Sequence, residues 1–188
     1  METVLRITSA GTGTKYPLRS NYARAASVRP LSKNGEILLE LKIPPLIQVF
    51  LVGFGMLAIS RLIPSLTLSI PASISIGVVV VLIGAIVALA GVLEFRKVKT
   101  TVDPRYPQKS EILVITGIYK ISRNPMYLGF LILLFGWFVI LENVATLLLL
   151  PIFLLYINQF QIKPEEKFLL KKFGSDFSQY CNKVRRWI

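Results

Sequence analysis

The sequence predicts an all-α, polytopic integral membrane protein. We expect about four transmembrane helices, the last two forming a tight hairpin, followed by C-terminal cytosolic or interfacial helices. The first observation behind this fold class is composition: 53% of the 188 residues are hydrophobic, 17% are charged, and mean hydropathy is +0.60. A water-soluble domain of this size could not bury so much apolar surface. The other two observations are the apolar runs and the placement of the charges between them.

The charged residues fall into three segments. Residues 1–42, 94–125 and 160–188 each hold seven Lys or Arg and three Asp or Glu, which leaves only Arg61 and Glu142 elsewhere. Because Lys and Arg accumulate on the cytoplasmic side of membrane proteins, both termini and the middle loop are predicted to be cytoplasmic. Nucleic-acid binding is the competing interpretation of the net charge of +12, but these charges flank apolar runs and form no single stripe. The predicted partner is therefore the lipid bilayer and not a nucleic acid.

Two residue types exclude several classes of chemistry. Histidine is absent from the sequence, and Cys181 is the only cysteine. A His-dependent catalytic triad and a His-ligated zinc site are therefore excluded, and an intramolecular disulfide cannot form. The sequence predicts no metal site.

The N-terminal half divides into an arm and two apolar spans. Residues 1–42 have a loop-like basic composition and are expected to form a mostly disordered arm; a transit peptide is the alternative, and a cleavable signal peptide is not expected. Residues 43–93 are predicted to hold two transmembrane helices, from about Pro44 to Ile63 and from Ile70 to Leu93. Arg61 lies in the last turn of the first, where it can reach the interface.

Small residues recur along the second span. Gly77, Gly84 and Gly91 are seven residues apart, and Ala88 lies on nearly the same face. Such a stripe predicts close packing against a neighbouring helix in lipid.

Residues 94–188 are predicted to be a cofactor-binding region built around a helical hairpin. Its two apolar runs, Pro125 to Leu141 and Val144 to Phe160, are separated by two residues and must turn back sharply. Each is shorter than the roughly 20 residues of a simple span, so thinning, tilt or a shallow hairpin stays open. Pro151 is expected to kink the second run.

The C-terminal tail is predicted to be helical from Pro164 to Phe173 and to stop at Gly174. After it, apolar and aromatic residues advance by four, three, four and three positions, the pattern of an amphipathic interfacial helix. The members of this stripe are Phe173, Phe177, Tyr180, Val184 and Trp187.

The hairpin brings two polar stretches together. Because it goes out and returns, we expect Asn124 and Tyr127 to lie near Gln161, Glu165 and Glu166 at one membrane face, in a composite pocket. Each element alone has a simpler structural explanation. An Asn-Pro pair is a good helix start, acids favour a helix first turn, and tyrosines occupy membrane interfaces.

As a set, these motifs resemble a known signature. Gly117-Ile118-Tyr119, Ser122 to Gly129, Pro164-Glu165-Glu166 and the final Val184-Arg185-Arg186-Trp187 resemble the C-terminal signature of the isoprenylcysteine carboxyl methyltransferase and phospholipid methyltransferase superfamily of integral membrane enzymes. The resemblance covers about residues 93–188, half of the chain. It implies S-adenosylmethionine as cofactor, held between the loop before the hairpin and the helix after it.

By position, the resemblance implies a set of cofactor-contacting residues, among which Glu165 would receive the ammonium group of the donor. The set is Ile112, Leu113, Val114, Tyr119, Asn124, Pro125, Met126, Tyr127 and Glu165. Gln161 stands where relatives acting on prenylated cysteine have an Arg, and is the implied substrate-binding residue. Because an amide offers no charge to a carboxylate, this replacement argues against a free prenylcysteine carboxylate as substrate.

The predicted function is therefore S-adenosylmethionine-dependent methyl transfer to a small lipophilic or lipid-linked acceptor at the cytoplasmic membrane face. A thiol, an amine or a carboxylate is favoured over an alcohol, because without histidine few groups can remove a proton from a neutral acceptor. Two alternatives stay open. One is a membrane NADPH-dependent reductase of the sterol or steroid type, and the other is a non-catalytic membrane protein.

Overall fold

The computed structural model describes residues 44–97 and 113–188, and this part of the chain is built from helices and turns. An antiparallel bridge between Thr67 and Asn143 joins two of the turns. The predicted arm, residues 1–42, lies outside the described residues. The helices are α2 (Pro45–Leu62), η2 (Pro64–Leu66), α3 (Ser73–Lys97), η4 (Gly117–Lys120), α4 (Pro125–Leu141), α5 (Val144–Leu147), α6 (Leu149–Ile157), the π-helical η5 (Asn158–Ile162), α7 (Lys163–Phe173) and α8 (Ser175–Lys183).

Among the described residues, three helical segments are long and apolar enough to cross a membrane: Pro45–Leu62, Ser73–Lys97 and Val144–Phe173. The prediction of a helical membrane protein is therefore confirmed. At 17 residues, α4 is shorter. A rise of about 1.5 Å per residue gives it about 25 Å, against a hydrocarbon core of about 30 Å. A fourth crossing, and with it the transmembrane hairpin, stays a prediction.

The boundary between the last apolar run and the tail differs from the prediction. Instead of a new helix starting at Pro164, α6 passes through the π-helical turn of η5 directly into α7, and helical structure extends from Val144 to Phe173. Proline has no N–H to donate and its ring crowds the preceding turn. A π-helical turn widens the backbone before the proline and lets the helix continue.

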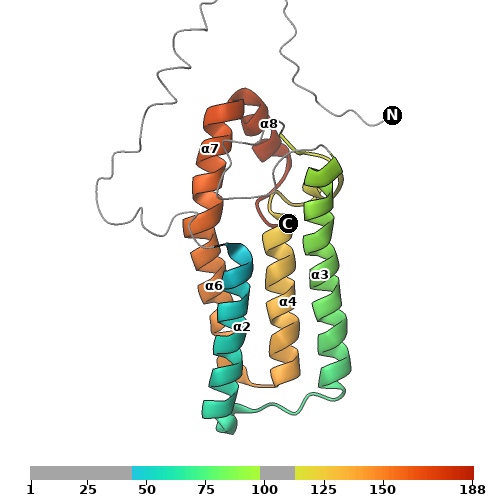
Figure 1. The fold of residues 1–188 in the computed structure, drawn as a ribbon, viewed down its shortest axis with the longest axis vertical. Coiled ribbons are helices and arrows are strands. Elements are labelled where there is room, and N and C mark those ends of the chain that lie inside the picture. The colour runs from blue at the N-terminus through green and yellow to red at the C-terminus, as the bar shows by residue number, and fades with distance from the viewer. Residues whose placement is uncertain (1–43, 98–112) are drawn as a thin grey trace, which may run out of the picture.

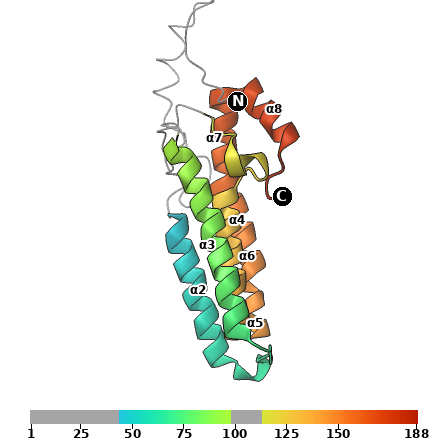
Figure 2. The ribbon, with the colours of Figure 1, turned by 90° about the vertical axis from the view of Figure 1, so that its right-hand side faces the viewer.

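Helices α3 and α4 lie side by side in both ribbon views (Figures 1 and 2). The predicted glycine stripe of α3 is the reason for their close approach. A Cβ added to Gly84 would stand 2.7 Å from the carbonyl oxygen of Gly129, and one added to Gly77 would stand 2.8 Å from that of Gly136. Gly129 and Gly136 repeat the seven-residue spacing on α4, so the two helices meet backbone to backbone. The predicted close packing is confirmed.

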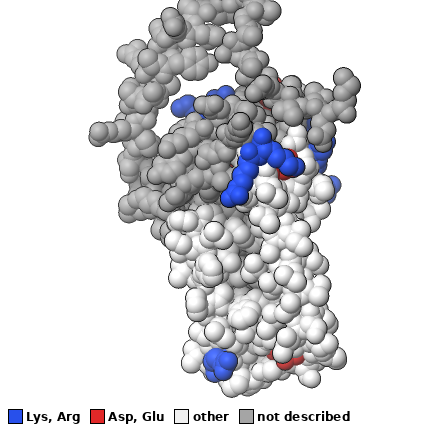
Figure 3. Space-filling model, turned by 45° about the vertical axis from the view of Figure 1, so that its right-hand side comes forward, with Lys and Arg blue, Asp and Glu red and all other residues white. Residues whose placement is uncertain are grey.

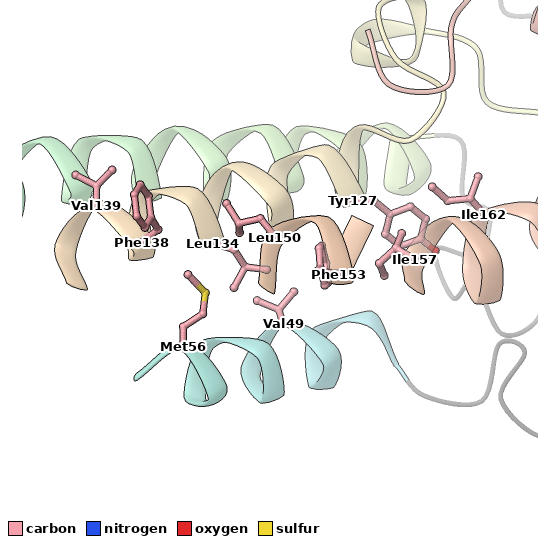
Figure 4. Packing of buried hydrophobic residues seen from close by; sticks show 10 residues of the cluster. All are labelled: Val49, Met56, Tyr127, Leu134, Phe138, Val139, Leu150, Phe153, Ile157 and Ile162. Carbon is pink, nitrogen blue, oxygen red and sulfur yellow. The ribbon is translucent and has the colours of Figure 1, made fainter. Parts of the chain in front are cut away.

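The main apolar core lies between α2, α4 and α6 (Figure 4). Met56, Leu134 and Phe153 are at most 1% exposed. The opposite faces of α2 and α3 expose many large apolar side chains, such as Phe54 and Ile86. In the view of Figure 3, charged side chains occupy the two ends of the bundle and leave an uncharged band between them. This is the surface expected where lipid takes the place of water.

The tail stops and turns at Gly174, as predicted. Its φ of 52° is favourable for glycine, and its N–H closes the last turn of α7 on Leu170. The predicted interfacial helix after it needs correction, because α8 ends at Lys183 and Val184 is extended. The apolar stripe of α8 is also buried inside the protein and does not face lipid: Phe177, Tyr180 and Val184 pack with Leu113 and Ile115, among others.

Candidate active site

Two polar groups from distant parts of the sequence meet at the end of the bundle where α4 begins. Tyr127 lies in the first turn of α4 and Glu165 in the first turn of α7. The Tyr127 hydroxyl donates a hydrogen bond to Oε2 of Glu165 over 3.3 Å, across 38 residues of sequence. Tyr127 is 2% exposed and Glu165 is half-buried. The carboxylate therefore sits at the edge of the apolar core, where charge is costly unless it is partnered.

The two adjacent glutamates have different surroundings. Glu166 receives a two-point contact from the Arg186 guanidinium, Nη2 to Oε2 at 2.6 Å and Nε to Oε1 at 3.1 Å. Arg123 adds a third contact, from Nη1 to Oε1 at 3.2 Å. Within residues 44–97 and 113–188, no such ion pair reaches Glu165. Two arginines thus neutralise Glu166, whereas Glu165 accepts a hydrogen bond from the Tyr127 hydroxyl.

A short helical loop borders the site. In η4, Tyr119 is 5% exposed and packs edge-on against Phe95 at a centroid distance of 5.4 Å. Its backbone carbonyl oxygen accepts a hydrogen bond from the Tyr180 hydroxyl at 2.7 Å. Burial raises the pKa of both Tyr119 and Tyr180 well above the ordinary tyrosine value. Both hydroxyls keep their protons at physiological pH, and that of Tyr180 is the donor in the bond to Tyr119.

Glu94, near the end of α3, fixes the start of this loop. Its Oε2 accepts the Thr116 hydroxyl at 2.9 Å, and Lys97 pairs with the other oxygen at 2.6 Å. The next residue, Gly117, has a φ of 57°, and a Cβ there would run into the Glu94 carboxyl group. Sequence reasoning missed this contact. The available signal was an acid at the end of an otherwise apolar helix, together with a Thr-Gly pair that begins 22 residues later.

Asn124 does not cap α4 with its side chain as the simple explanation would have it. Its Nδ2 donates to the carbonyl oxygen of Arg186 at 3.0 Å, and its own N–H bonds to Ser122 Oγ at 3.1 Å. Pro125 occupies the first helical position, as expected. The Asn124 side chain thus donates to the Arg186 carbonyl and does not accept from the first N–H groups of α4.

The remaining predicted site residues lie around this centre. Met126 and Pro125 face Gly91 of α3. Val114 is 7% exposed, and Leu113 packs on the core of α8. Gln161 is fully buried in the π-helical η5, four residues before Glu165. Ile112 falls outside the described residues.

An open groove lies between α7 and α8. It includes Glu166 but neither Tyr127 nor Glu165, and it is lined by Lys163, Glu166, Lys167, Leu170, Phe177, Ser178, Cys181 and Asn182. In the described part of the chain, no group of three His, Cys, Asp or Glu side chains gathers as a metal site would need.

Apolar helices of membrane length and a carboxylate hydrogen-bonded to a buried tyrosine define a helical membrane protein with a polar site at one end of its bundle. The comparison with known families agrees. The phospholipid methyltransferase family model matches residues 72–176, and the chain belongs to this family. The match includes the η4 loop, α4 and the Glu165–Glu166 pair, and it confirms the predicted superfamily.

Individual relatives show the same relationship. An uncharacterized protein of Haemophilus influenzae is 48% identical over 63 residues, which are 34% of this chain and all of that protein. The protein-S-isoprenylcysteine O-methyltransferase of Saccharomyces cerevisiae is 35% identical over 77 residues, 41% of this chain and 32% of the relative. A probable protein-S-isoprenylcysteine O-methyltransferase of Oryza sativa subsp. indica is 30% identical over 109 residues, 58% of this chain and 57% of the relative. The chain therefore aligns with between a third and somewhat over half of these methyltransferases.

Proposed function

We propose that the protein transfers a methyl group from S-adenosylmethionine to a small lipophilic or lipid-linked acceptor at the cytoplasmic face of a membrane. Family membership supports the reaction class. The observation that carries the proposal is the contact between Tyr127 and Glu165. The Glu165 carboxylate has no ion-pair partner among the described residues. It lies close to the buried Tyr127 and Tyr119, at the edge of an apolar core.

These residues fit the proposed donor. Its amino-acid end carries an ammonium group, which Glu165 can bind by charge and hydrogen bonding, while Tyr127 holds the carboxylate in place. Leu113, Val114 and Tyr119 offer apolar surface for the nucleoside end. When bound, S-adenosylmethionine supplies an electrophilic methyl group on a sulfonium.

The chain's own contribution to the reaction is orientation and exclusion of water. Tyr127 and Glu165 fix one end of the donor site, and the η4 loop, pinned by Glu94, fixes another. Methyl transfer to an anionic acceptor neutralises charge, so a site with few polar walls favours the transition state over the separated ions. Alignment of the two reactants supplies a further part of the rate.

Gln161 is proposed to face the acceptor. It is fully buried, and it lies four residues before Glu165 on the same helical segment. An amide offers hydrogen bonds without charge. The acceptor classes proposed are therefore a lipophilic thiol, amine or carboxylate, excluding a free prenylcysteine carboxylate held by an arginine.

The proposed topology has four crossings with both termini in the cytoplasm. In Figure 1 the start of α2, the end of α3, the start of α4 and α7 all lie toward one end of the bundle. Arg61 and Glu142 belong to the other end. This distribution of basic segments supports a cytoplasmic site.

Calorimetric titration with S-adenosylhomocysteine, using detergent-purified full-length protein, tests the donor site. We expect micromolar binding by the wild type and at least about tenfold weaker binding by Glu165→Gln, because a hydrogen bond to a charged group contributes about 1.5–3 kcal/mol. Tyr127→Phe should weaken binding less, since it removes one hydroxyl and keeps the ring.

Matched controls are Asp176→Asn, an exposed acid in the first turn of α8, and Tyr156→Phe, a half-buried tyrosine of α6 whose ring packs against Phe160. Both should bind as the wild type does. Binding of NADPH in place of S-adenosylhomocysteine, or equal loss in the controls, would contradict the proposal. Lipid extracts incubated with methyl-tritiated donor would then identify the acceptor by the lipid that takes up label.

A further inference from the structure

The last residues of the chain are tied to the loop before α4. The Arg123 N–H donates to the carbonyl oxygen of Arg185 at 3.1 Å. The Arg186 carbonyl accepts from Asn124 Nδ2 at 3.0 Å and from Ser122 Oγ at 3.4 Å. Trp187 then packs against the main apolar core. Residues 184–187, called the C-terminal strap below, therefore pack against the loop before α4 and the end of the apolar core, and do not form a free tail.

The strap also holds α7 through one side chain. The Arg186 guanidinium binds both oxygens of Glu166, and Arg123 binds one of them. Three segments that are far apart in sequence meet at this carboxylate: α7, the loop before α4, and the strap. Arg123 is 15% exposed and Glu166 19% exposed at their side chains. Partial burial strengthens such an ion pair relative to one in open water.

The position of Glu166 decides where Glu165 points. Successive residues on a helix differ in direction by about 100°, so fixing one side chain of the pair fixes the rotation of the first turn of α7 and hence the other. The backbone before this turn is π-helical, from Asn158 to Ile162. A π-helical turn shifts the angular register of the residues that follow it, and the ion pairs of Glu166 hold the first turn of α7 in that register.

We propose that Arg186, assisted by Arg123, is a positioning residue for donor binding: it clamps Glu166 so that Glu165 faces Tyr127 and the donor. The adjacent acids thereby have divided roles, Glu165 as the ligand of the donor and Glu166 as the anchor of the helix. This inference rests on the proposed function, since it assigns Glu165 to the donor.

The test compares Arg186→Gln with Arg185→Gln in the full-length protein. Both variants lie on the strap and remove one positive charge, but the Arg185 side chain is exposed and, among the described residues, Arg185 contacts the loop through its backbone carbonyl. We expect Arg186→Gln to weaken S-adenosylhomocysteine binding about tenfold or more and to raise the KM for the donor in proportion. The KM for the acceptor should stay within about twofold, Arg185→Gln should match the wild type, and Arg186→Lys should recover part of the affinity.

A purely structural clamp would give a different result. A lower melting temperature of Arg186→Gln with unchanged S-adenosylhomocysteine affinity would overturn the proposal. If Arg186→Gln does not fold, Glu166→Gln decides, because it removes the charge that both arginines bind; unchanged affinity there overturns the proposal as well. Loss of affinity in Glu166→Gln but not in a folded Arg186→Gln would assign Glu166 itself to the donor and also overturn it.

Failure of the proposed function is distinguishable. In that case the wild type itself does not bind S-adenosylhomocysteine. Hydrogen exchange of the α7 amides then tests the clamp alone. Faster exchange in Arg186→Gln than in Arg185→Gln supports the clamp, and equal exchange contradicts it.

Discussion

Two regions hold the protein together in opposite ways. One is the seam of glycines between α3 and α4. The other is a polar cap around Glu166, which consists of the η4 loop, the loop before α4, the first turn of α7, α8 and the C-terminal strap. In the seam, glycines bring two backbones together: the Cβ position of Gly84 is 2.7 Å from the Gly129 carbonyl oxygen. In the cap, charged and polar side chains join segments that share no regular register, as Arg186 does with Glu166. The seam depends on the absence of side chains, whereas the cap depends on their presence.

The difference follows from the surroundings of the two regions. Apolar side chains gain little by leaving lipid for another helix, so close van der Waals packing is the main source of association there. At the cap, water is close, and each buried polar group needs a partner. Substitutions should therefore act by size in the seam and by hydrogen-bonding capacity in the cap.

The largest effect is expected for Gly84→Val. The added side chain would meet the Gly129 carbonyl and the Leu133 backbone at 2.6–2.7 Å, and neither backbone group can move without separating the helices. Overpacking of this kind costs about 1–3 kcal/mol or more. We expect loss of monodisperse protein in detergent, or a strongly lowered melting temperature, measured by size-exclusion chromatography and thermal unfolding.

Gly53→Val is the matched control for the seam. Gly53 is a helical glycine of α2, and a Cβ there meets nothing within 4 Å. The melting temperature of this variant should stay close to the wild type. If both glycine variants unfold alike, helix propensity rather than close approach explains the result, and the seam has no special role.

An intermediate effect is expected for Tyr180→Phe in the cap. The substitution keeps the ring in its apolar cluster but removes the hydroxyl that donates to the Tyr119 carbonyl at 2.7 Å. A buried acceptor left without its donor costs about 1–3 kcal/mol. Chemical denaturation should show a loss in this range. A loss below about 0.5 kcal/mol would mean that the η4 loop does not depend on this bond.

The same tyrosine gives the cap a pH dependence. Burial raises the pKa of Tyr180 in the folded state above the ordinary value of about 10. The stability that this group contributes is therefore complete below pH 10 and is lost as pH rises toward the folded-state pKa. Thermal unfolding between pH 8 and pH 11 should show a steeper alkaline loss for the wild type than for Tyr180→Phe. Equal slopes would contradict this assignment.

The seam could be predicted from the sequence, and most of the cap could not. The spacing of Gly77, Gly84 and Gly91 indicated a packed face because helical periodicity is local information, and the start of α4 at Pro125 followed from the rules for helix first turns. Contacts such as Asn124 to the Arg186 carbonyl depend on the path of an extended segment 62 residues later. No periodic pattern encodes that path.

The helix boundaries show the same division. The stop at Gly174 was predicted from one residue, but the continuation of α6 into α7 was not, because a proline usually marks a helix start or a kink. Its tolerance here depends on the π-helical turn before it. Likewise, the stripe predicted the amphipathic helix that carries Phe177 and Tyr180, but not that it ends before Val184, nor what covers it: the protein itself buries this face. Periodicity gives the direction of an apolar face and not its partner.

The smallest effect is expected for Arg61→Gln, which tests the end of the bundle remote from the cap. Arg61 lies exposed in the last turn of α2, where its side chain can reach the membrane interface. A surface substitution without buried partners changes stability by about 0.5 kcal/mol or less, so the melting temperature and S-adenosylhomocysteine affinity should match the wild type. Hydrogen bonds already join the turns at this end, from the buried Asn143 to the Ile63 carbonyl and from the Ile70 N–H to Glu142. A loss comparable to that of Tyr180→Phe would show that Arg61 takes part in this network and is not only a surface charge.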